Sequence, residues 1–251
     1  MNKQVIILAA GKGTRMNIDM PKVLAPILGR PMIEHVLDAT AKVLANQKPV
    51  VVVGFQGEKV QSQIGNRANV VWQTEQLGTG HAVAAARQAL ANHRGAIMVL
   101  YGDHPLVNYK TIENLFRLHE ESGAVLSMMT TAVDDFIDWR QGFFGFGRIL
   151  RNGGGGICGI KELKDCTDEE KQIRELNPGY YCFDSEWLWN NIDELKNDNA
   201  QKEYYLTDLV KRAFEQNKNI CETKIHPIEC LGINTKEQLE LVEGLVQRRV
   251  E

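Results

Sequence analysis

A glycine-rich segment near the N-terminus carries the residue types that bind phosphate. Gly11 and Gly13 directly follow an apolar run, and Lys12, Arg15 and Lys22 place three cations within eleven residues. Glycines expose backbone N–H groups and let the chain approach an anion closely, and the cations supply opposite charge. The spacing fits neither the dinucleotide fingerprint nor a Walker A loop. We therefore predict a polyphosphate site here, with a glycine turn and solvated lysines as the alternative.

A second segment, residues 73–82, follows a strand-like run and opens a helical pattern. Gln73 carries a donor and an acceptor in one amide, which can read the edge of a base. Gly78 and Gly80 permit close backbone approach, and a helix beginning after Thr79 would favour negative charge at its N-terminus. A capped helix start without a ligand explains the same residues equally well.

A third segment places Asp103 directly after an apolar strand-like run. Magnesium prefers one or two carboxylates and completes its shell with water and phosphate oxygens, so a strand-end aspartate is a candidate ligand. A cap or turn role is the alternative. His104 precedes Pro105 and is interpreted as structural rather than as a general base.

The elements around these segments predict an α/β domain. Strands are expected at residues 5–10, 50–55, 69–73 and 97–101, and helices from Pro31 and at residues 58–64, 80–90 and 109–121. Such alternation indicates a mostly parallel sheet covered on both faces, which binds ligands beyond the C-terminal ends of its strands. All three segments fall at that edge, so together they favour a nucleotide phosphate bound with a divalent cation.

The second half of the chain has a different sequence pattern. Short strand-like pieces at residues 147–150 and 157–161 are separated by glycines, and Asn152 followed by Gly153 predicts a hairpin. A further strand at 180–183, a helix at 206–215 and an amphipathic helix at 235–250 are expected. We predict one α/β domain over residues 1–230, followed by a helical segment over 231–251.

Composition excludes several classes of protein. A net charge of -3 with 43% hydrophobic residues argues against general disorder and against general affinity for nucleic acid. The five cysteines form no CxxC pair, which indicates free thiols in a reducing compartment. No apolar run is long enough for a membrane span, and the N-terminal run is too short for a secretory signal. A cytoplasmic protein without nucleic-acid or membrane partners is expected, and its oligomeric state stays open.

A family resemblance follows from these motifs. Residues 8–16 with Pro21 and Lys22 resemble the signature of sugar-phosphate nucleotidylyltransferases. Residues 76–82, 101–103 and 197–208 narrow the resemblance to the uridylyltransferase domain of the bacterial bifunctional UDP-N-acetylglucosamine pyrophosphorylase / glucosamine-1-phosphate N-acetyltransferase family. This resemblance implies a Rossmann-like nucleotide-diphospho-sugar transferase fold with a mostly parallel mixed sheet flanked by helices. It also implies a Mg²⁺-dependent reaction of UTP with N-acetylglucosamine-1-phosphate that yields UDP-N-acetylglucosamine and pyrophosphate, as used in peptidoglycan synthesis.

The resemblance also implies site residues. Arg15, Lys22 and Asp103 would be catalytic, and Asp103 with Asn234 would bind Mg²⁺. Gln73 would read uracil. The residues implied to contact the substrates are Leu8, Ala9, Ala10, Gly11, Lys22, Gln73, Gly78, Thr79, Tyr101, Asp103, Gly147, Glu162, Asn177 and Asn234.

The sugar side carries departures from the family pattern. Gly147, Glu162 and Asn177 would hold the sugar and its N-acetyl group, but Pro178 stands where a threonine is usual and His104 where an apolar residue is usual. Two alternatives therefore stay open: the same chemistry on another sugar-1-phosphate, and a non-catalytic nucleotide-sugar-binding domain. No hexapeptide repeat follows the last helix, so neither the acetyltransferase activity nor the trimer built by that domain is carried over from the family; a naturally short enzyme and an excised domain both fit the sequence.

Overall fold

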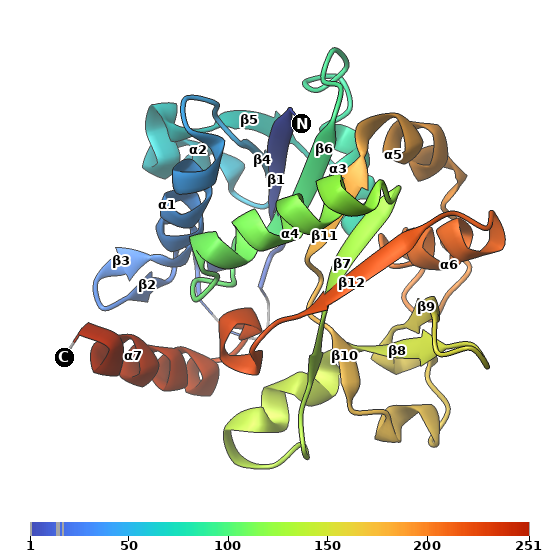
Figure 1. The fold of residues 1–251 in the computed structure, drawn as a ribbon. Helices are drawn as coiled ribbons and strands as arrows, with labels where there is room; N and C mark the ends of the chain where they lie inside the picture. The colour runs from blue at the N-terminus through green and yellow to red at the C-terminus, as the bar shows by residue number, and fades with distance from the viewer. Residues whose placement is uncertain (1, 14–15, 17, 251) are drawn as a thin grey trace.

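A mixed β-sheet runs through the whole molecule (Figure 1). The computed structural model describes residues 2–13, 16 and 18–250, and within them the sheet has ten strands in the order β5-β4-β1-β6-β11-β7-β10-β8-β9, with β12 paired to β7. These strands are β1 (Lys3–Ala9), β4 (Val50–Val53), β5 (Asn69–Trp72), β6 (Ala96–Tyr101), β7 (Leu126–Ala132), β8 (Gly147–Arg151), β9 (Ile157–Lys161), β10 (Glu175–Asn177), β11 (Tyr181–Asp184) and β12 (Ile220–Lys224). The predicted α/β class with a mixed sheet is confirmed.

Helices cover both faces of this sheet (Figure 1). They are α1 (Met32–Leu44), α2 (Gly57–Ile64), α3 (Thr79–Ala85), α4 (Tyr109–Ser122), α5 (Ser185–Asn191), α6 (Asp208–Glu215) and α7 (Lys236–Val250). Strands β5, β4, β1 and β6 are parallel neighbours. Each is joined to the next along the chain by a helix, as the alternating pattern predicts.

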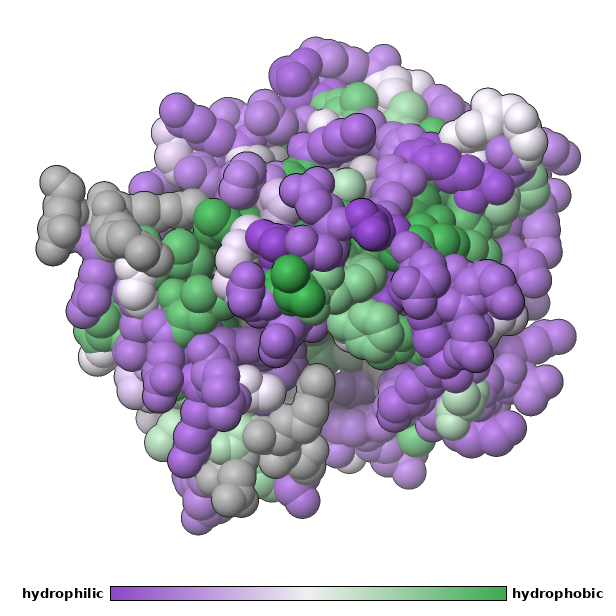
Figure 2. All heavy atoms as spheres, turned by 90° about the horizontal axis from the view of Figure 1, so that it is seen from below, coloured by the Kyte–Doolittle hydropathy of each residue, from purple (hydrophilic) through white to green (hydrophobic). Residues whose placement is uncertain are grey.

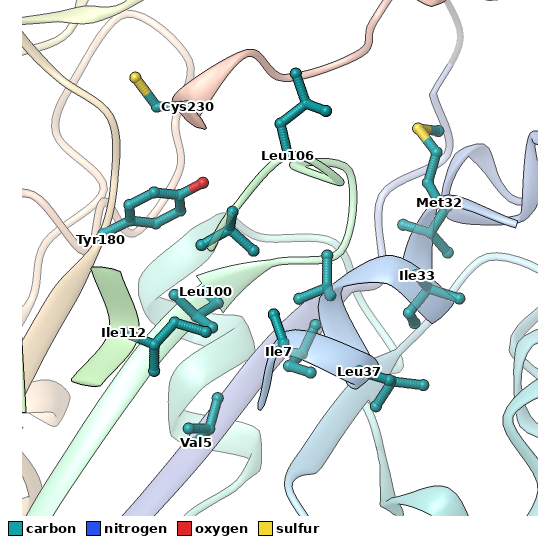
Figure 3. Close-up of a cluster of buried hydrophobic side chains, with 14 of the residues drawn as sticks. Val5, Ile7, Met32, Ile33, Leu37, Leu100, Leu106, Ile112, Tyr180 and Cys230 are labelled. Atoms are coloured by element: carbon teal, nitrogen blue, oxygen red, sulfur yellow. The ribbon is translucent and has the colours of Figure 1, made fainter. Parts of the chain in front are cut away.

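Strand β1 contributes to two separate cores. Val5 and Ile7 point to the face covered by α1, α2 and α4, whereas Ile6 and Leu8 point to the face covered by α3, α5 and α6. Figure 3 shows part of the first cluster, where Val5 and Ile7 lie between Ile112 of α4 and Leu37 of α1. Because both faces are covered, the strand is apolar without polar alternation. The two cores hold the C-terminal end of β1, and the glycine loop that follows it, at a defined position.

The second half of the sheet is largely antiparallel. Strand β11 pairs antiparallel with both β6 and β7, and β8 and β9 form the predicted hairpin. Asn152 closes the hairpin loop, since its Oδ1 accepts hydrogen bonds from the backbone N–H groups of Gly154 and Gly156 at 3.0 Å each. This half therefore packs beside β6 as a continuation of the same sheet.

Several sequence-based boundaries are wrong. The helix expected over residues 80–90 ends at Ala85, because the chain continues as turns with bonds such as Arg87 N to Ala84 O (3.0 Å). The helix expected from residue 206 begins at Asp208. Strands β7, β10 and β12 and helix α5 were not predicted. Strand β7 is buried along nearly its whole length, so it shows no alternation of apolar and polar residues.

Helix α7 lies beside the short hairpin of β2 (Pro26–Ile27) and β3 (Arg30–Pro31) (Figure 1). Its Val242 is buried, and Glu243 Oε1 accepts a 3.0 Å hydrogen bond from the backbone N–H of Leu28. The C-terminal helix thus contacts the segment that leads out of the glycine loop. Among the described residues, no helix has the length and apolar character needed to cross a membrane.

Candidate active site

A pocket opens where β1 and β6 end. Figure 2 shows this side of the molecule, where apolar atoms lie between hydrophilic ones around a hollowed surface. Ten of the residues implied by the resemblance line the pocket, namely Leu8, Ala9, Ala10, Gly11, Lys22, Gln73, Gly78, Thr79, Tyr101 and Asp103. The three sequence segments therefore meet at one edge of the sheet, as parallel strands require.

The glycine loop packs closely against the stem of Lys22. Gly13 has a φ of +63°, and a Cβ placed there would lie 2.5 Å from the Cβ of Lys22. Only a glycine adopts this conformation readily and leaves room for the lysine stem. Lys22 begins the short 3-10 helix η2 (Lys22–Leu24). Arg15, predicted to be catalytic, lies outside the described residues, so its role stays a prediction.

Lys22, Asp103 and Asn234 form one cluster. The Lys22 ammonium forms an ion pair with Asp103 Oδ2 and donates a 2.8 Å hydrogen bond to Asn234 Oδ1. The backbone N–H of Ile233 donates to the carbonyl of Asp103 at 3.1 Å. This pairing brings together two predicted metal ligands that are 131 positions apart in the chain.

The charge of Asp103 is stabilised by its neighbours. Burial by itself raises the pKa of this carboxyl, but Lys22 and His104 outweigh burial, so the pKa lies below its ordinary value. A carboxylate that stays ionised at neutral pH is able to hold a cation. Its 8% exposure keeps water from screening the charge.

The donor set suits a magnesium ion that also contacts phosphate. Oxygens of Asp103 and Asn234 converge on one point, which is occupied by the Lys22 ammonium. Within the described residues, no three His, Cys, Asp or Glu side chains gather as a metal cage. Magnesium needs no such cage, because it takes one or two protein oxygens and completes its shell with water and substrate phosphate. The residues present therefore fit this ion.

The opposite wall of the pocket is held by hydrogen bonds. Gln73 Nε2 donates to the carbonyl of Gly78 and lies near His81 Nδ1, both at 3.1 Å. Because a carbonyl can only accept, this bond fixes the orientation of the amide. Helix α3 begins at Thr79, one residue before the predicted start, and Gly78 is its N-cap. Thr79 Oγ1 accepts from the backbone N–H of Leu206 at 3.0 Å.

The residues implied to hold the sugar lie next to this pocket but do not line it. Glu162 faces a neighbouring groove between β9 and α6, where its Oε1 accepts a 3.2 Å hydrogen bond from Thr207. A Cβ on Gly147 would lie 3.4 Å from the same Oε1. Burial raises the pKa of Glu162, the hydrogen bond from Thr207 lowers it, and the nearby charges of Asp208 and Asp165 raise it further. Gly147 and Glu162 are therefore neighbours, as the resemblance implies.

Asn177 approaches the pocket through Tyr101. Its Oδ1 accepts a 3.0 Å hydrogen bond from the backbone N–H of Gly179. A Cβ on Gly179, which has a φ of +85°, would lie 2.4 Å from the Tyr101 ring. Burial raises the pKa of Tyr101, and the charges of Glu162 and Asp103 raise it further. Tyr101 thus lies between this pocket and Gly179, beside Asn177.

His104 has the structural role that the sequence predicts. Its Nδ1 lies 3.0 Å from the hydroxyl of Tyr180, which donates to the carbonyl of Glu229 at 3.1 Å. With the tyrosine proton used in that bond, Nδ1 of His104 must be the donor. Burial lowers the pKa of His104, and its ring packs against Tyr101 and Gly232. The histidine therefore braces the segment that leads to Asn234.

Some residues of the site had no predicted role. Thr207 bonds Glu162, Tyr204 exchanges backbone hydrogen bonds with residues 77 and 80, and Gln76 and Glu203 line the pocket. All of them lie inside segments that carry the family resemblance. A polar side chain within one of those segments was the signal that could have identified each of these residues as part of the site.

Comparisons with known proteins agree with this geometry. The chain is 43% identical over 250 residues to Bifunctional protein GlmU of Heliobacterium modesticaldum, covering 99% of this chain and 53% of the relative. It is 41% identical, with the same coverage, to Bifunctional protein GlmU of Bacillus cytotoxicus. The chain thus spans about half the length of the curated relatives it matches. These relatives confirm the resemblance drawn from the sequence motifs.

The fold has a solved counterpart at low sequence identity. CMP:2-keto-3-deoxy-manno-octonic acid synthetase complexed with CTP superposes with a TM-score of 0.68 at 17% identity, covering 99% of this chain and 100% of that chain. At this identity the likeness shows the fold alone. The profile of the MobA-like NTP transferase domain matches residues 5–211, which include most of the pocket. The protein therefore belongs to the MobA-like NTP transferase domain family, as a nucleotidyltransferase similar to the curated GlmU relatives.

Proposed function

We propose that the protein is a uridylyltransferase that forms UDP-N-acetylglucosamine and pyrophosphate from UTP and N-acetylglucosamine-1-phosphate, with Mg²⁺ as cofactor. The observation that carries this proposal is the cluster of Lys22, Asp103 and Asn234 at the mouth of a pocket beside a glycine loop. About 40% identity to curated GlmU relatives over nearly the whole chain supports the substrate assignment.

The proposed reaction is an in-line transfer. A phosphate oxygen of the sugar phosphate attacks the α-phosphorus of UTP, and the bond from this phosphorus to pyrophosphate breaks. Asp103 and Asn234 would hold Mg²⁺, which stabilises negative charge on the phosphate oxygens. Lys22 and Arg15 would neutralise charge that develops on the leaving pyrophosphate. Positioning and charge neutralisation are sufficient for such a transfer, and no covalent nucleophile is needed.

Recognition of the base is assigned to Gln73. The hydrogen bonds of its side chain use Nε2, which points to Gly78 and His81. The carbonyl oxygen of the same amide is an acceptor suited to the N3–H group of uracil. The rigid segment from Gly78 to Gly80 would lie beside the ribose and phosphates.

Selection of the sugar is assigned to Glu162 and Asn177. Glu162 is held by Thr207, and Asn177 by the backbone of Gly179. Polar groups built to pair with an N-acetyl amide would be left unpaired by glucose, which disfavours that sugar strongly. This makes N-acetylglucosamine-1-phosphate the favoured acceptor over glucose-1-phosphate or glucosamine-1-phosphate.

The test is pyrophosphate release with MgCl₂ and UTP against each of these three sugar phosphates, with CTP in a parallel series. We expect release with UTP and N-acetylglucosamine-1-phosphate, reduced about a thousandfold or more in Asp103→Ala. Asp193→Ala, an exposed aspartate paired with Arg87, is the control and should keep full activity. Preference for another sugar or for CTP would contradict the substrate assignment. Nucleotide binding without release would instead support a non-catalytic domain.

A further inference from the structure

The ammonium of Lys22 lies where a cation held by Asp103 and Asn234 would lie. It forms an ion pair with the aspartate Oδ2 and hydrogen bonds to the asparagine Oδ1 at 2.8 Å. We propose that Lys22 is the resident cation of this pair in the free protein, and that the divalent cation takes its place only when a nucleotide offers the lysine new anionic partners. This inference rests on the proposed function, because that function supplies the metal and the nucleotide.

The Lys22 ammonium and the divalent cation cannot both occupy the position between Asp103 and Asn234. Magnesium lies about 2.0–2.1 Å from its oxygen ligands, whereas an ammonium nitrogen needs about 2.8 Å. A metal bound to the same two oxygens would therefore overlap the present position of the Lys22 nitrogen and repel its charge. Binding of the metal requires the ammonium to leave.

The side chain of Lys22 is placed so that its ammonium can move away from Asp103 and Asn234 while the backbone stays in place. Its stem passes over Gly13, which has no side chain to block it, and Val23 beside it is buried and anchors η2. Lys22 also lines the pocket, so its four-carbon stem can turn toward a bound phosphate. The movement is a change of rotamer.

Charge balance explains why the lysine stays until a nucleotide arrives. The side chains of Lys22 and Asp103 are only 14% and 11% exposed, so an unpaired Asp103 would be costly. A tethered cation competes with free metal at a high effective concentration. Phosphates of a nucleotide attract the ammonium and allow both cations to be paired. We therefore expect metal and nucleotide to bind with positive coupling.

The experiment measures Mn²⁺ binding to the nucleotide-free full chain by electron paramagnetic resonance. Lys22→Met should bind Mn²⁺ about tenfold more tightly than the unmodified protein, and adding Asp103→Asn to this variant should abolish the gain. Lys161→Met is the matched control, since it removes a lysine from another partly buried ion pair, with Glu170, and should leave Mn²⁺ affinity unchanged.

Thermal unfolding gives a second readout that does not depend on activity. Lys22→Met should melt at a lower temperature than the unmodified protein without metal, and Mn²⁺ should restore more of its stability than it adds to the unmodified protein. If Lys22→Met does not fold, Lys22→Gln provides the same comparison with a neutral amide.

Equal Mn²⁺ affinity in Lys22→Met and the unmodified protein would overturn the inference, as would a gain that persists with Asp103→Asn. Either result, obtained with an unmodified protein that releases pyrophosphate, would leave the proposed function intact. A gain that depends on Asp103 in a protein without pyrophosphate release would support the inference and count against the function.

Discussion

Two carboxylates lie near Tyr101, the buried Asp103 and the partly buried Glu162, and their surroundings shift their pKa values in opposite directions. Asp103 is paired with Lys22, and this pairing lowers its pKa in spite of burial. Glu162 accepts a hydrogen bond from the neutral hydroxyl of Thr207, and burial raises its pKa. A compensating cation beside the carboxylate accounts for the difference.

The difference separates the two ends of the site by what they recognise. The end at Asp103 balances full charges, which suits phosphates and a metal. The end at Glu162 offers a carboxylate whose hydrogen-bond partner is the hydroxyl of Thr207, which suits a neutral sugar and its amide. The first end is built from parallel strand ends and the second from the antiparallel half of the sheet. Each end should therefore respond to its own substitutions.

At the phosphate end, Gly13→Ala is expected to have the largest effect of the substitutions that leave the cluster of Lys22, Asp103 and Asn234 itself unchanged. The added Cβ would lie 2.5 Å from Cβ of Lys22 at a φ of +63°, so the lysine must shift. We expect kcat to fall about a hundredfold, measured by pyrophosphate release. Gly123→Ala is the matched control, because Gly123 has a φ of +61° with nothing within 4 Å of an added Cβ. Equal effects in both variants would contradict a specific role for the Gly13–Lys22 contact.

A smaller effect, confined to the sugar end, is expected from the titration of Glu162. Its pKa is raised, so lowering the pH protonates it at values where an ordinary glutamate is still charged. We expect KM for the sugar phosphate to rise as the pH falls through this pKa, while KM for UTP follows a different profile. Glu162→Gln should raise the sugar KM about tenfold.

Glu162→Gln also provides the control for the pH dependence of the KM for the sugar phosphate. Since glutamine does not titrate, the sugar KM of Glu162→Gln should lose the part of the pH dependence that the unmodified protein owes to this group. An unchanged profile would mean that another group, such as the sugar phosphate itself, causes the dependence. The raised pKa of Glu162 would then no longer distinguish the sugar end of the site from the phosphate end.

The smallest effect on activity is expected from Arg148→Met. Arg148 is fully buried, and its guanidinium donates to the backbone carbonyls of Phe144, Phe146 and Lys171. Its removal leaves these carbonyls unpaired, so we expect a loss of about 2–3 kcal/mol in the free energy of unfolding. Activity should change only through the sugar KM, because Gly147 is the adjacent residue.

Urea denaturation measures this loss of stability. Arg151→Met is the control on the same strand, since Arg151 is partly exposed and pairs with Glu175 and Glu222. Its removal should cost less than about 1 kcal/mol, because the ion pairs are near water. A larger loss from Arg151→Met than from Arg148→Met would contradict the role assigned to the buried guanidinium.

The parallel half of the fold and the phosphate end of the site were predictable to within a few residues. Strand β1 and the glycine loop are identified by a short apolar run followed by glycines and cations, which is a local pattern. The antiparallel half was predicted less well. Strand β12 reads ICETK and has only partly buried or exposed residues, so its place beside β7 depends on pairing across distant parts of the chain.

The sequence by itself determined the α/β class, the glycine loop beside the pocket and the family resemblance, because these depend on spacing within short segments. Only the tertiary structure decided that Asn234 meets Asp103, that Lys22 lies between them, and that Glu162 is partly buried beside Thr207. Such contacts depend on which strands become neighbours, and pairing between distant segments leaves no periodic signal in either one. The charge state of each end of the site follows from those contacts.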